Sequence, residues 1–204
     1  MLGLLIFLFL VPNYFCEDNT RNDIRPVPLI NFPNSVKVEY TNFRNWAGET
    51  NIQTWIAYPE SPDQILQLAN WAKENSMKIR PCGLRHSWSR LVTEKGFDNV
   101  VLVDTTKHLN KMGIISSTPG NASFWAEAGL SMVSILEQLE SSNLSLASVP
   151  TTGDVSIGGV VAVGGHGLGI PTANDKKPLG HTFGSISNLV IEFTAVVFDS
   201  TSKR

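Results

Sequence analysis

Apolar positions in this chain fall into short runs and alternations that predict strands. Residues 100–103 are all apolar, which is typical of a strand buried on both faces of a sheet. Other segments alternate, or are rich in β-branched residues, and are bounded by turn-forming residues. We expect strands at residues 52–58, 77–80, 99–104, 123–128, 145–149 and 189–198, the last being the strongest, and a short buried strand at 160–163.

Two other segments show the spacing of helices. Ser61, Pro62 and Asp63 give the first helix a capping hydroxyl, a proline in its first turn and a carboxylate at the positive end of the dipole. Ser131 is expected to cap the second helix. The apolar positions on one face are Ile65, Leu68, Ala69 and Ala72 in the first helix, which runs to Lys73, and Ile135, Leu136 and Leu139 in the second.

The order of these elements predicts an α+β fold in two lobes. Strands and helices follow one another as β-α-β, β, β-α-β, β, with a break near Met112. Before them, residues 17–44 contain Pro26, Pro28 and Pro33, so we expect an extended lead-in there. The folded domain is expected to cover residues 45–204.

The N-terminal residues 1–15 are apolar apart from Asn13, and Pro12 interrupts them. The run is short for a membrane span and has the length of the apolar part of a signal peptide. We therefore expect a signal peptide at residues 1–16 and a secreted or lumenal protein. No Lys or Arg precedes the run, so two alternatives stay open: an uncleaved segment that anchors the protein in a membrane, or an incorrectly assigned start.

Composition and charge narrow the class of protein. With 42% hydrophobic and 17% charged residues the chain is typical of a globular protein, and its net charge of −2 argues against nucleic acid as a partner. Without residues 1–16, Cys82 is the only cysteine, which excludes an intrachain disulfide. The triplets Asn121-Ala-Ser123 and Asn143-Leu-Ser145 fit N-glycosylation of a secreted chain, and such triplets also arise by chance.

Seven of the chain's 16 glycines lie between Gly153 and Gly169. Glycine loses more conformational freedom on folding than other residues, so such a cluster marks backbone that bends sharply or approaches something closely. Two readings are open: ordinary turns around a strand, or loops whose N–H groups bind a ligand rich in acceptor oxygens. The stretch contains neither a P-loop nor a Rossmann fingerprint. An earlier loop at residues 81–88 offers a glycine, a histidine and hydroxyl groups, and two such loops can hold a pyrophosphate between them.

These two loops resemble those of a known family. In chain order the shared residues are Gly83-x-x-His86-Ser87, Val103-Asp104, Ala126-x-Ala128-Gly129, Pro150-x-x-Gly153, Ser156-x-Gly158-Gly159, Gly164-Gly165-His166-Gly167 and Gly184-Ser185-Ile186-x-Asn188-Leu189-Val190. With them the sequence resembles the FAD-binding PCMH-type domain of the vanillyl-alcohol oxidase superfamily, over about residues 45–204. Within it the chain is most similar to the covalent-flavin class of cholesterol oxidases, through segments 83–91, 104–110 and 179–185. Aldonolactone and alditol oxidases share Asn45-Trp46 and His86-Ser87 and come next.

The resemblance implies that FAD is the cofactor and that His86 bonds through a ring nitrogen to the 8α-methyl group of the flavin. The alternative is an unbonded loop histidine that contacts a phosphate. Leu84 and Arg85 depart from the family, where glycine is more frequent just before the histidine. Some relatives attach the flavin a second time through a cysteine before the second loop, whereas this chain has residues 149–152 (Val-Pro-Thr-Thr) there, so we expect a single attachment. Cys82 is expected to be a small buried residue rather than a reactive thiol.

The other cofactor contacts are also implied by the resemblance. Ser156, Gly158 and Gly159 would donate hydrogen bonds to the pyrophosphate and ribityl oxygens. The alternative is a role in strand and turn geometry, and both can hold together. Residues 184–190 would run beside the adenine. His166 is expected to make a structural hydrogen bond rather than to act in catalysis, and His108 and His181 are expected to be structural. Together with His86, the expected FAD-binding residues are Cys82, Gly83, Leu84, Arg85, Ser87, Thr152, Gly153, Ser156, Gly158, Gly159, Gly164, His166 and Val190. No group of residues shows metal-ligand spacing, so we expect no metal.

The implied function is that of a flavin-dependent oxidase. Such an enzyme oxidises a small-molecule alcohol (a sterol, a sugar alcohol or an aldonolactone) and reduces O2 to H2O2. In this family the acid and base residues lie in a substrate domain C-terminal to the FAD domain, so we expect a chain truncated at Arg204 and name no catalytic residue. The alternatives are a non-catalytic flavin-binding module and a dehydrogenase that passes electrons to another acceptor.

Overall fold

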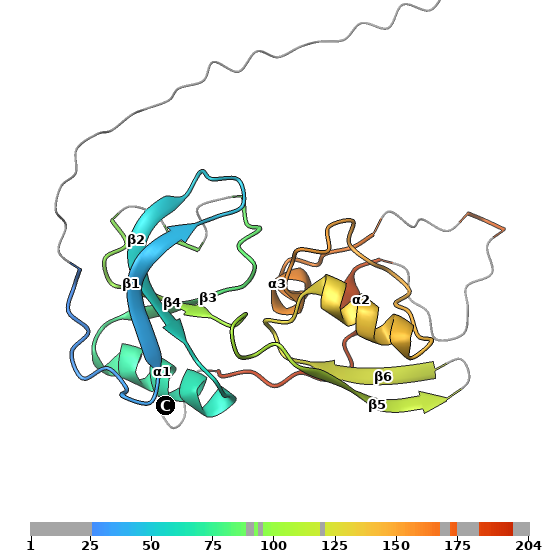
Figure 1. Ribbon diagram of the computed structural model, residues 1–204, viewed down its shortest axis with the longest axis horizontal. Coiled ribbons are helices and arrows are strands. Elements are labelled where there is room, and N and C mark those ends of the chain that lie inside the picture. Colours follow the sequence, from blue (N-terminus) through green and yellow to red (C-terminus); the bar gives the residue numbers. More distant parts are fainter. Residues whose placement is uncertain are drawn as a thin grey trace, which may run out of the picture.

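The computed structural model describes residues 26–88, 92–93, 96–118, 121–167, 172–174 and 184–197. In Figure 1 their elements form two groups, a sheet with one helix and a hairpin with two helices. The first group ends with β4, and the second begins with β5 at Met112, the position of the expected break. The two-lobed α+β arrangement is therefore confirmed.

The first lobe is a four-stranded sheet in the order β1-β2-β4-β3. Its strands are β1 (Lys37–Arg44), β2 (Asn51–Tyr58), β3 (Lys78–Cys82) and β4 (Val100–Asp104). β1 and β2 run antiparallel, whereas β2 and β3 both run parallel to β4. The carboxyl ends of three parallel strands therefore meet at one edge of this sheet, where open α/β sheets usually bind ligands.

Helix α1 (Pro62–Glu74) covers one face of this sheet. Ser61 caps it as expected, since its side chain accepts a hydrogen bond from the backbone N–H of Gln64. Leu68 and Trp71 of the helix pack against Val101 of β4 in the core. Every residue of β4 is buried, as the apolar run predicts.

The second lobe is built on the hairpin of β5 (Met112–Thr118) and β6 (Asn121–Ala126). Helices α2 (Met132–Ser141) and α3 (Ile157–Ala162) lie on one face of the hairpin, and the short 3-10 helix η1 (Ile186–Leu189) follows (Figure 1). The buried core residues of this lobe are Leu130, Met132, Ile135, Leu139, Val160 and Ile186. No helix in the described part of the chain is long and apolar enough to cross a membrane.

Three expected strands are wrong. Residues 160–163 belong mostly to α3 rather than to a strand, and residues 145–149 form no regular element. Residues 190–197 form no strand with any described residue, and Ile191 and Phe193 are 83% and 80% exposed. Apolar, β-branched composition favours a strand only where a partner strand is in place, and this segment has none among the described residues. Phe198 lies outside the described residues.

Two strands were missed. β1 lies within the expected lead-in and pairs with β2 along its whole length. β5 lies at the expected break between the lobes and pairs with β6. The helices expected at residues 62–73 and after Ser131 are confirmed, as are the strands at 52–58, 77–80, 99–104 and 123–128 within a few residues at their ends.

Candidate functional site

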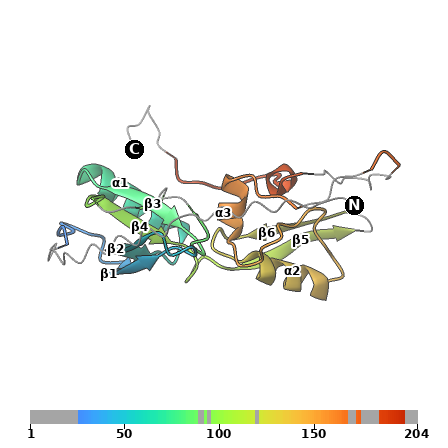
Figure 2. The same cartoon turned by 90° about the horizontal axis from the view of Figure 1, so that it is seen from above.

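The two loops singled out in the sequence touch each other at Gly83. We name residues 83–88, which follow β3, the His86 loop, and residues 151–156, which precede α3, the Ser156 loop. A Cβ atom placed on Gly83 would lie 1.9 Å from Oγ of Ser156 and 2.9 Å from its Cβ. Only glycine fits at this contact, and it joins the first lobe to the second. Figure 2 shows the two lobes side by side from above.

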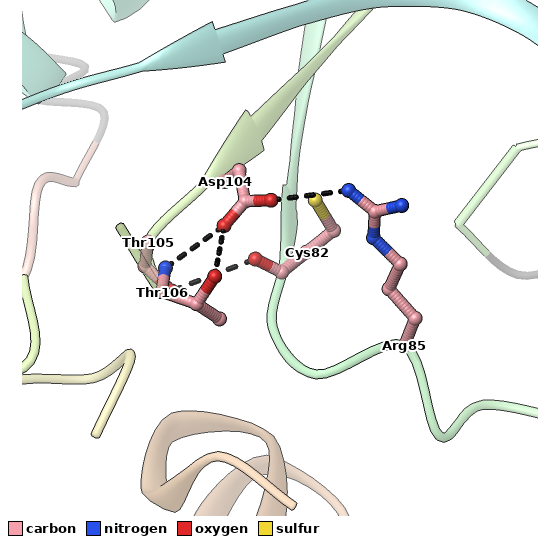
Figure 3. Close-up of polar contacts among 5 residues, drawn as sticks. All are labelled: Cys82, Arg85, Asp104, Thr105 and Thr106. Atoms are coloured by element: carbon pink, nitrogen blue, oxygen red, sulfur yellow. Dashed lines mark hydrogen bonds and ion pairs between the residues drawn. The ribbon is translucent and has the colours of Figure 1, made fainter. Parts of the chain in front are cut away.

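An ion pair fixes the base of the His86 loop (Figure 3). Asp104, at the end of β4 and only 4% exposed, accepts hydrogen bonds from the backbone N–H of Thr106 (2.9 Å) and from its hydroxyl (2.6 Å). Nη2 of Arg85 lies 3.3 Å from Oδ2 of the same carboxylate. Arg85 has a φ of 63°, which for a side-chain-bearing residue costs about 1 kcal/mol. The contact with Asp104 helps to offset this cost.

Cys82 lies beside this ion pair, and its thiol is buried. Its carbonyl accepts a hydrogen bond from the backbone N–H of Thr105 (3.3 Å), which continues the pairing of β3 and β4. Burial, and then the nearby Asp104 carboxylate, raise the pKa of the Cys82 thiol to about 12, although Arg85 acts in the opposite direction. A thiol with so high a pKa is protonated near neutral pH and is a poor nucleophile, as expected for a small buried residue.

The backbone of the His86 loop presents free donors. In the part of the chain that the structure describes, no acceptor is bonded to the backbone N–H groups of residues 84–87. Successive N–H groups around a left-handed residue such as Arg85 form a concavity that binds anions. The side chains of Leu84 and Arg85, where relatives more often have glycine, therefore do not exclude phosphate binding by the backbone.

The His86 ring lies among exposed aromatic rings. Its centroid is 4.9 Å from that of Trp46, with an angle of 28° between the planes, and 6.5 Å from that of Trp88. The two indoles are 59% and 57% exposed. None of the described residues hydrogen-bonds to the imidazole nitrogens. The role of Trp46 was not found from the sequence, where Asn45-Trp46 was only a point of resemblance.

The Ser156 loop is held against α2. Backbone N–H groups of Met132 and Val133 donate to the carbonyls of Val155 (2.9 Å) and Gly153 (3.3 Å). A Cβ on Gly153 would lie 2.3 Å from Cγ2 of Val133, so this glycine is needed for close packing. Thr152 is exposed beside it.

Gly158 has a packing role, the structural alternative to a cofactor contact. Its N–H donates to the carbonyl of Ala128 (2.9 Å), and a Cβ there would lie 2.9 Å from Cβ of Ala128. The donor that the resemblance assigned to pyrophosphate is thus already used. Gly159 is exposed, and a Cβ there would lie 3.4 Å from Oγ of Ser156, an ordinary contact.

The remaining expected residues cluster at η1. Gly164 has a φ of 66°, and the backbone N–H of Ile186 donates to the carbonyl of Gly165 (2.8 Å). Nδ1 of His166 lies 2.9 Å from the carbonyl oxygen of Gly167, a local contact of the expected structural kind. Val190 follows η1 and is exposed. No described hydrogen bond joins these residues to the His86 loop, and His181 lies outside the described residues.

A cavity of about 270 Å3 opens beside the His86 loop. It lies at the carboxyl edge of β2, β3 and β4. Within it Nζ of Lys107 is 3.7 Å from the centroid of the Tyr58 ring, and burial raises the pKa of the Tyr58 hydroxyl. Its lining residues are Tyr58, Gly83, Leu84, Arg85, Asp104, Thr106 and Lys107. Among the described residues no three His, Cys, Asp or Glu side chains are grouped as metal ligands.

Three comparisons relate this chain to known proteins. The family model described as "FAD binding domain" matches residues 54–177. The fold is similar to that of a cholesterol oxidase from B. sterolicum, with a TM-score of 0.80 and 41% identity, over 86% of this chain and 33% of that one.

Several of the curated relatives are lactone oxidases. L-gulonolactone oxidase 3 of Arabidopsis thaliana is 26% identical over 55% of this chain and 19% of its own length. L-gulonolactone oxidase of Scyliorhinus torazame is 27% identical over 63% of this chain and 28% of its own length. The chain therefore spans about a fifth to a third of the length of these three proteins.

Proposed function

Because the chain belongs to the FAD binding domain family, we propose that it forms the FAD-binding part of an oxidase that oxidises an alcohol and reduces O2 to H2O2. The names of the similar proteins favour a sterol or an aldonolactone as the class of substrate, and the sequence resemblance adds a sugar alcohol. Bound FAD would supply the acceptor for the hydride of the alcohol.

One observation supports this proposal above the others: the contact of the two loops at Gly83. The free N–H groups of the His86 loop are suited to a pyrophosphate, and the Ser156 hydroxyl lies directly across the contact. Neither loop supplies a lysine, so the diphosphate would be held by backbone dipoles. The residues present therefore fit FAD.

We further propose that His86 is the point of covalent attachment. The ring is half-buried and lies in the His86 loop, next to the N–H groups proposed to bind the pyrophosphate. Its nitrogens have no partner among the described residues. His86 would lose a ring N–H proton and bond to the 8α carbon of the flavin, where one C–H bond breaks and a second proton leaves. In balance, the two protons and two electrons released by this bond formation would reduce O2 to H2O2.

The test uses the full chain expressed with added riboflavin in a secretory host, with His86→Ala beside it and His108→Ala as a matched control. After acid precipitation, flavin absorbance should stay with the wild-type and His108→Ala polypeptides. It should be released from His86→Ala, which still binds FAD before precipitation. Release of flavin from the wild-type protein would refute covalent attachment. Absence of FAD from all three proteins before precipitation would refute FAD binding by the two loops.

Substrate panels separate the oxidase from its alternatives. Cholesterol, xylitol and L-gulono-1,4-lactone are added without oxygen to the flavin-loaded protein. Bleaching followed by fast recovery in air supports the oxidase, and slow recovery indicates a dehydrogenase. No bleaching by any alcohol would indicate a flavin-binding module without turnover.

A further inference from the structure

The turn between β1 and β2 is a rigid, hydrogen-bonded unit. The backbone N–H of Asn45 donates to the carbonyl of Thr50 (3.0 Å), and the N–H of Thr50 donates to Oδ1 of Asn45 (3.0 Å). The carbonyl of Asn45 accepts from the N–H of Gly48 (3.0 Å). The side chain of Asn45 is 4% exposed, which is rare for an asparagine at a turn unless its polar atoms are bonded.

Two hydrogen bonds from this turn reach the His86 loop on either side of His86. The backbone N–H of Trp46 donates to the carbonyl of Arg85 (2.8 Å), the residue before the histidine. Nδ2 of Asn45 donates to the carbonyl of Ser87 (2.9 Å), the residue after it. The two residues that flank His86 are thus tied to one turn of another strand pair, and the backbone at His86 has little freedom to rotate.

The turn also contacts the imidazole itself. The indole of Trp46 stacks on one face of the His86 ring, and Trp88 lies 5.2 Å from Trp46, at the edge of the pair. Trp46 has little packing of its own to justify its position, since it is 59% exposed. Its main described contact is with the His86 ring, whose orientation would determine whether a ring nitrogen can reach the flavin.

We propose that Asn45 and Trp46 are positioning residues that orient the His86 ring for bond formation with the flavin. This inference rests on the proposed function and deepens it. The bond is the one proposed between a ring nitrogen of His86 and the 8α carbon of the flavin, with O2 as the oxidant. Asn45 fixes the backbone at His86, and Trp46 fixes the plane of the imidazole. Neither residue needs to touch the flavin for this role.

The experiment measures the rate of covalent attachment after the flavin-free chain is mixed with saturating FAD, using acid precipitation at successive times. Trp46→Leu removes the stacked ring but keeps the backbone N–H that binds Arg85, and we expect attachment to slow about 2- to 10-fold. Trp46→Phe keeps a ring and should restore most of the rate. Trp125→Leu, an exposed tryptophan on β6, is the control and should attach flavin at the wild-type rate.

Asn45→Asp tests the hydrogen bond from Asn45 to the Ser87 carbonyl, because the two side chains have nearly the same shape. It keeps the acceptor for Thr50 and loses the donor to Ser87, so we expect attachment to slow about 10- to 100-fold. Total FAD bound before precipitation and the midpoint of thermal unfolding are measured for each variant. A loss of rate at equal total FAD and an unchanged midpoint for Trp46→Leu supports positioning. Wild-type rates in both Trp46→Leu and Asn45→Asp would overturn it.

A second readout does not depend on the flavin. Diethyl pyrocarbonate modifies exposed imidazoles, and mass spectrometry of the peptide that contains His86 gives the rate. We expect His86 to react several-fold faster in Trp46→Leu than in the wild type, because one ring face is uncovered. If the wild-type protein binds FAD only non-covalently, the proposed covalent bond is refuted. The rate of His86 modification still tests whether Trp46 holds the imidazole ring in place. An unchanged reaction rate then overturns the inference.

Discussion

Replacing Gly83 by alanine adds a methyl group where the two loops touch. The new Cβ would lie 1.9 Å from Oγ of Ser156, whereas ordinary contacts begin near 3.4 Å. The contact must therefore open by about 1.5 Å. Ser156 is only 4% exposed, so its hydroxyl has little room to rotate away. We expect the overpacked contact to cost about 1–3 kcal/mol of unfolding free energy.

Thermal unfolding of the flavin-free chain measures this cost directly, and the midpoint should fall by roughly 2–12 °C in a domain of this size. Gly159→Ala is the matched control, because its Cβ would make only an ordinary 3.4 Å contact with the same hydroxyl. FAD binding should weaken in Gly83→Ala by about 5- to 150-fold if the whole free-energy cost of the overpacked contact is lost from the binding of FAD by the two loops.

A second substitution checks the mechanism. Ser156→Gly removes the hydroxyl and the Cβ from the contact, and the Ser156 side chain makes no capping hydrogen bond to α3. By itself this change should cost only a few tenths of a kcal/mol. The double variant Gly83→Ala with Ser156→Gly should therefore unfold near the midpoint of Ser156→Gly alone. An unaltered midpoint in Gly83→Ala, or a double variant no more stable than Gly83→Ala, would refute the contact between the lobes.

Four further outcomes are expected. Asp104→Asn leaves the Arg85 guanidinium without its carboxylate and should lower the unfolding free energy at pH 7 by about 1–3 kcal/mol, measured in urea. Iodoacetamide at pH 8 should leave Cys82 unmodified until the chain is unfolded. Because burial raises the pKa of that thiol to about 12 in the folded chain, its contribution to stability is complete below pH 9 or so and should be lost as the pH rises toward 12. Since Asn121 and Asn143 are exposed, a chain made in a eukaryotic secretory pathway should lose mass with an N-glycan endoglycosidase, and a chain of unchanged mass would contradict glycosylation.

The elements that could be predicted from the sequence have local signals. α1 has a capping serine, a proline in its first turn and a regular apolar face, and β4 is apolar throughout. β1 has no such signal: its burial pattern is irregular, and it exists because β2 pairs with it. Residues 160–163 show the reverse error. A short apolar run fits a strand or a helix equally well, and packing against the second-lobe core decided for the helix.

The loops of the candidate site could be predicted from the sequence, whereas the contacts that hold them in place could not. The glycines, His86 and Ser156 are visible in the sequence, and the resemblance ordered them into two loops. The pairing of Arg85 with Asp104 depends on the adjacency of β3 and β4, which brings together residues 19 positions apart. The bond from Asn45 to Ser87 joins residues 42 positions apart and has no local signal at all.

The most direct test of the central claim is the mass of the peptide that contains His86, taken from the acid-denatured, protease-digested chain after expression with riboflavin. A peptide heavier by one FAD less two hydrogen atoms, with fragmentation that places the added mass on His86, is the predicted result. Recovery of this peptide with no added mass from a chain that was yellow before denaturation, or flavin on another residue, would contradict the claim.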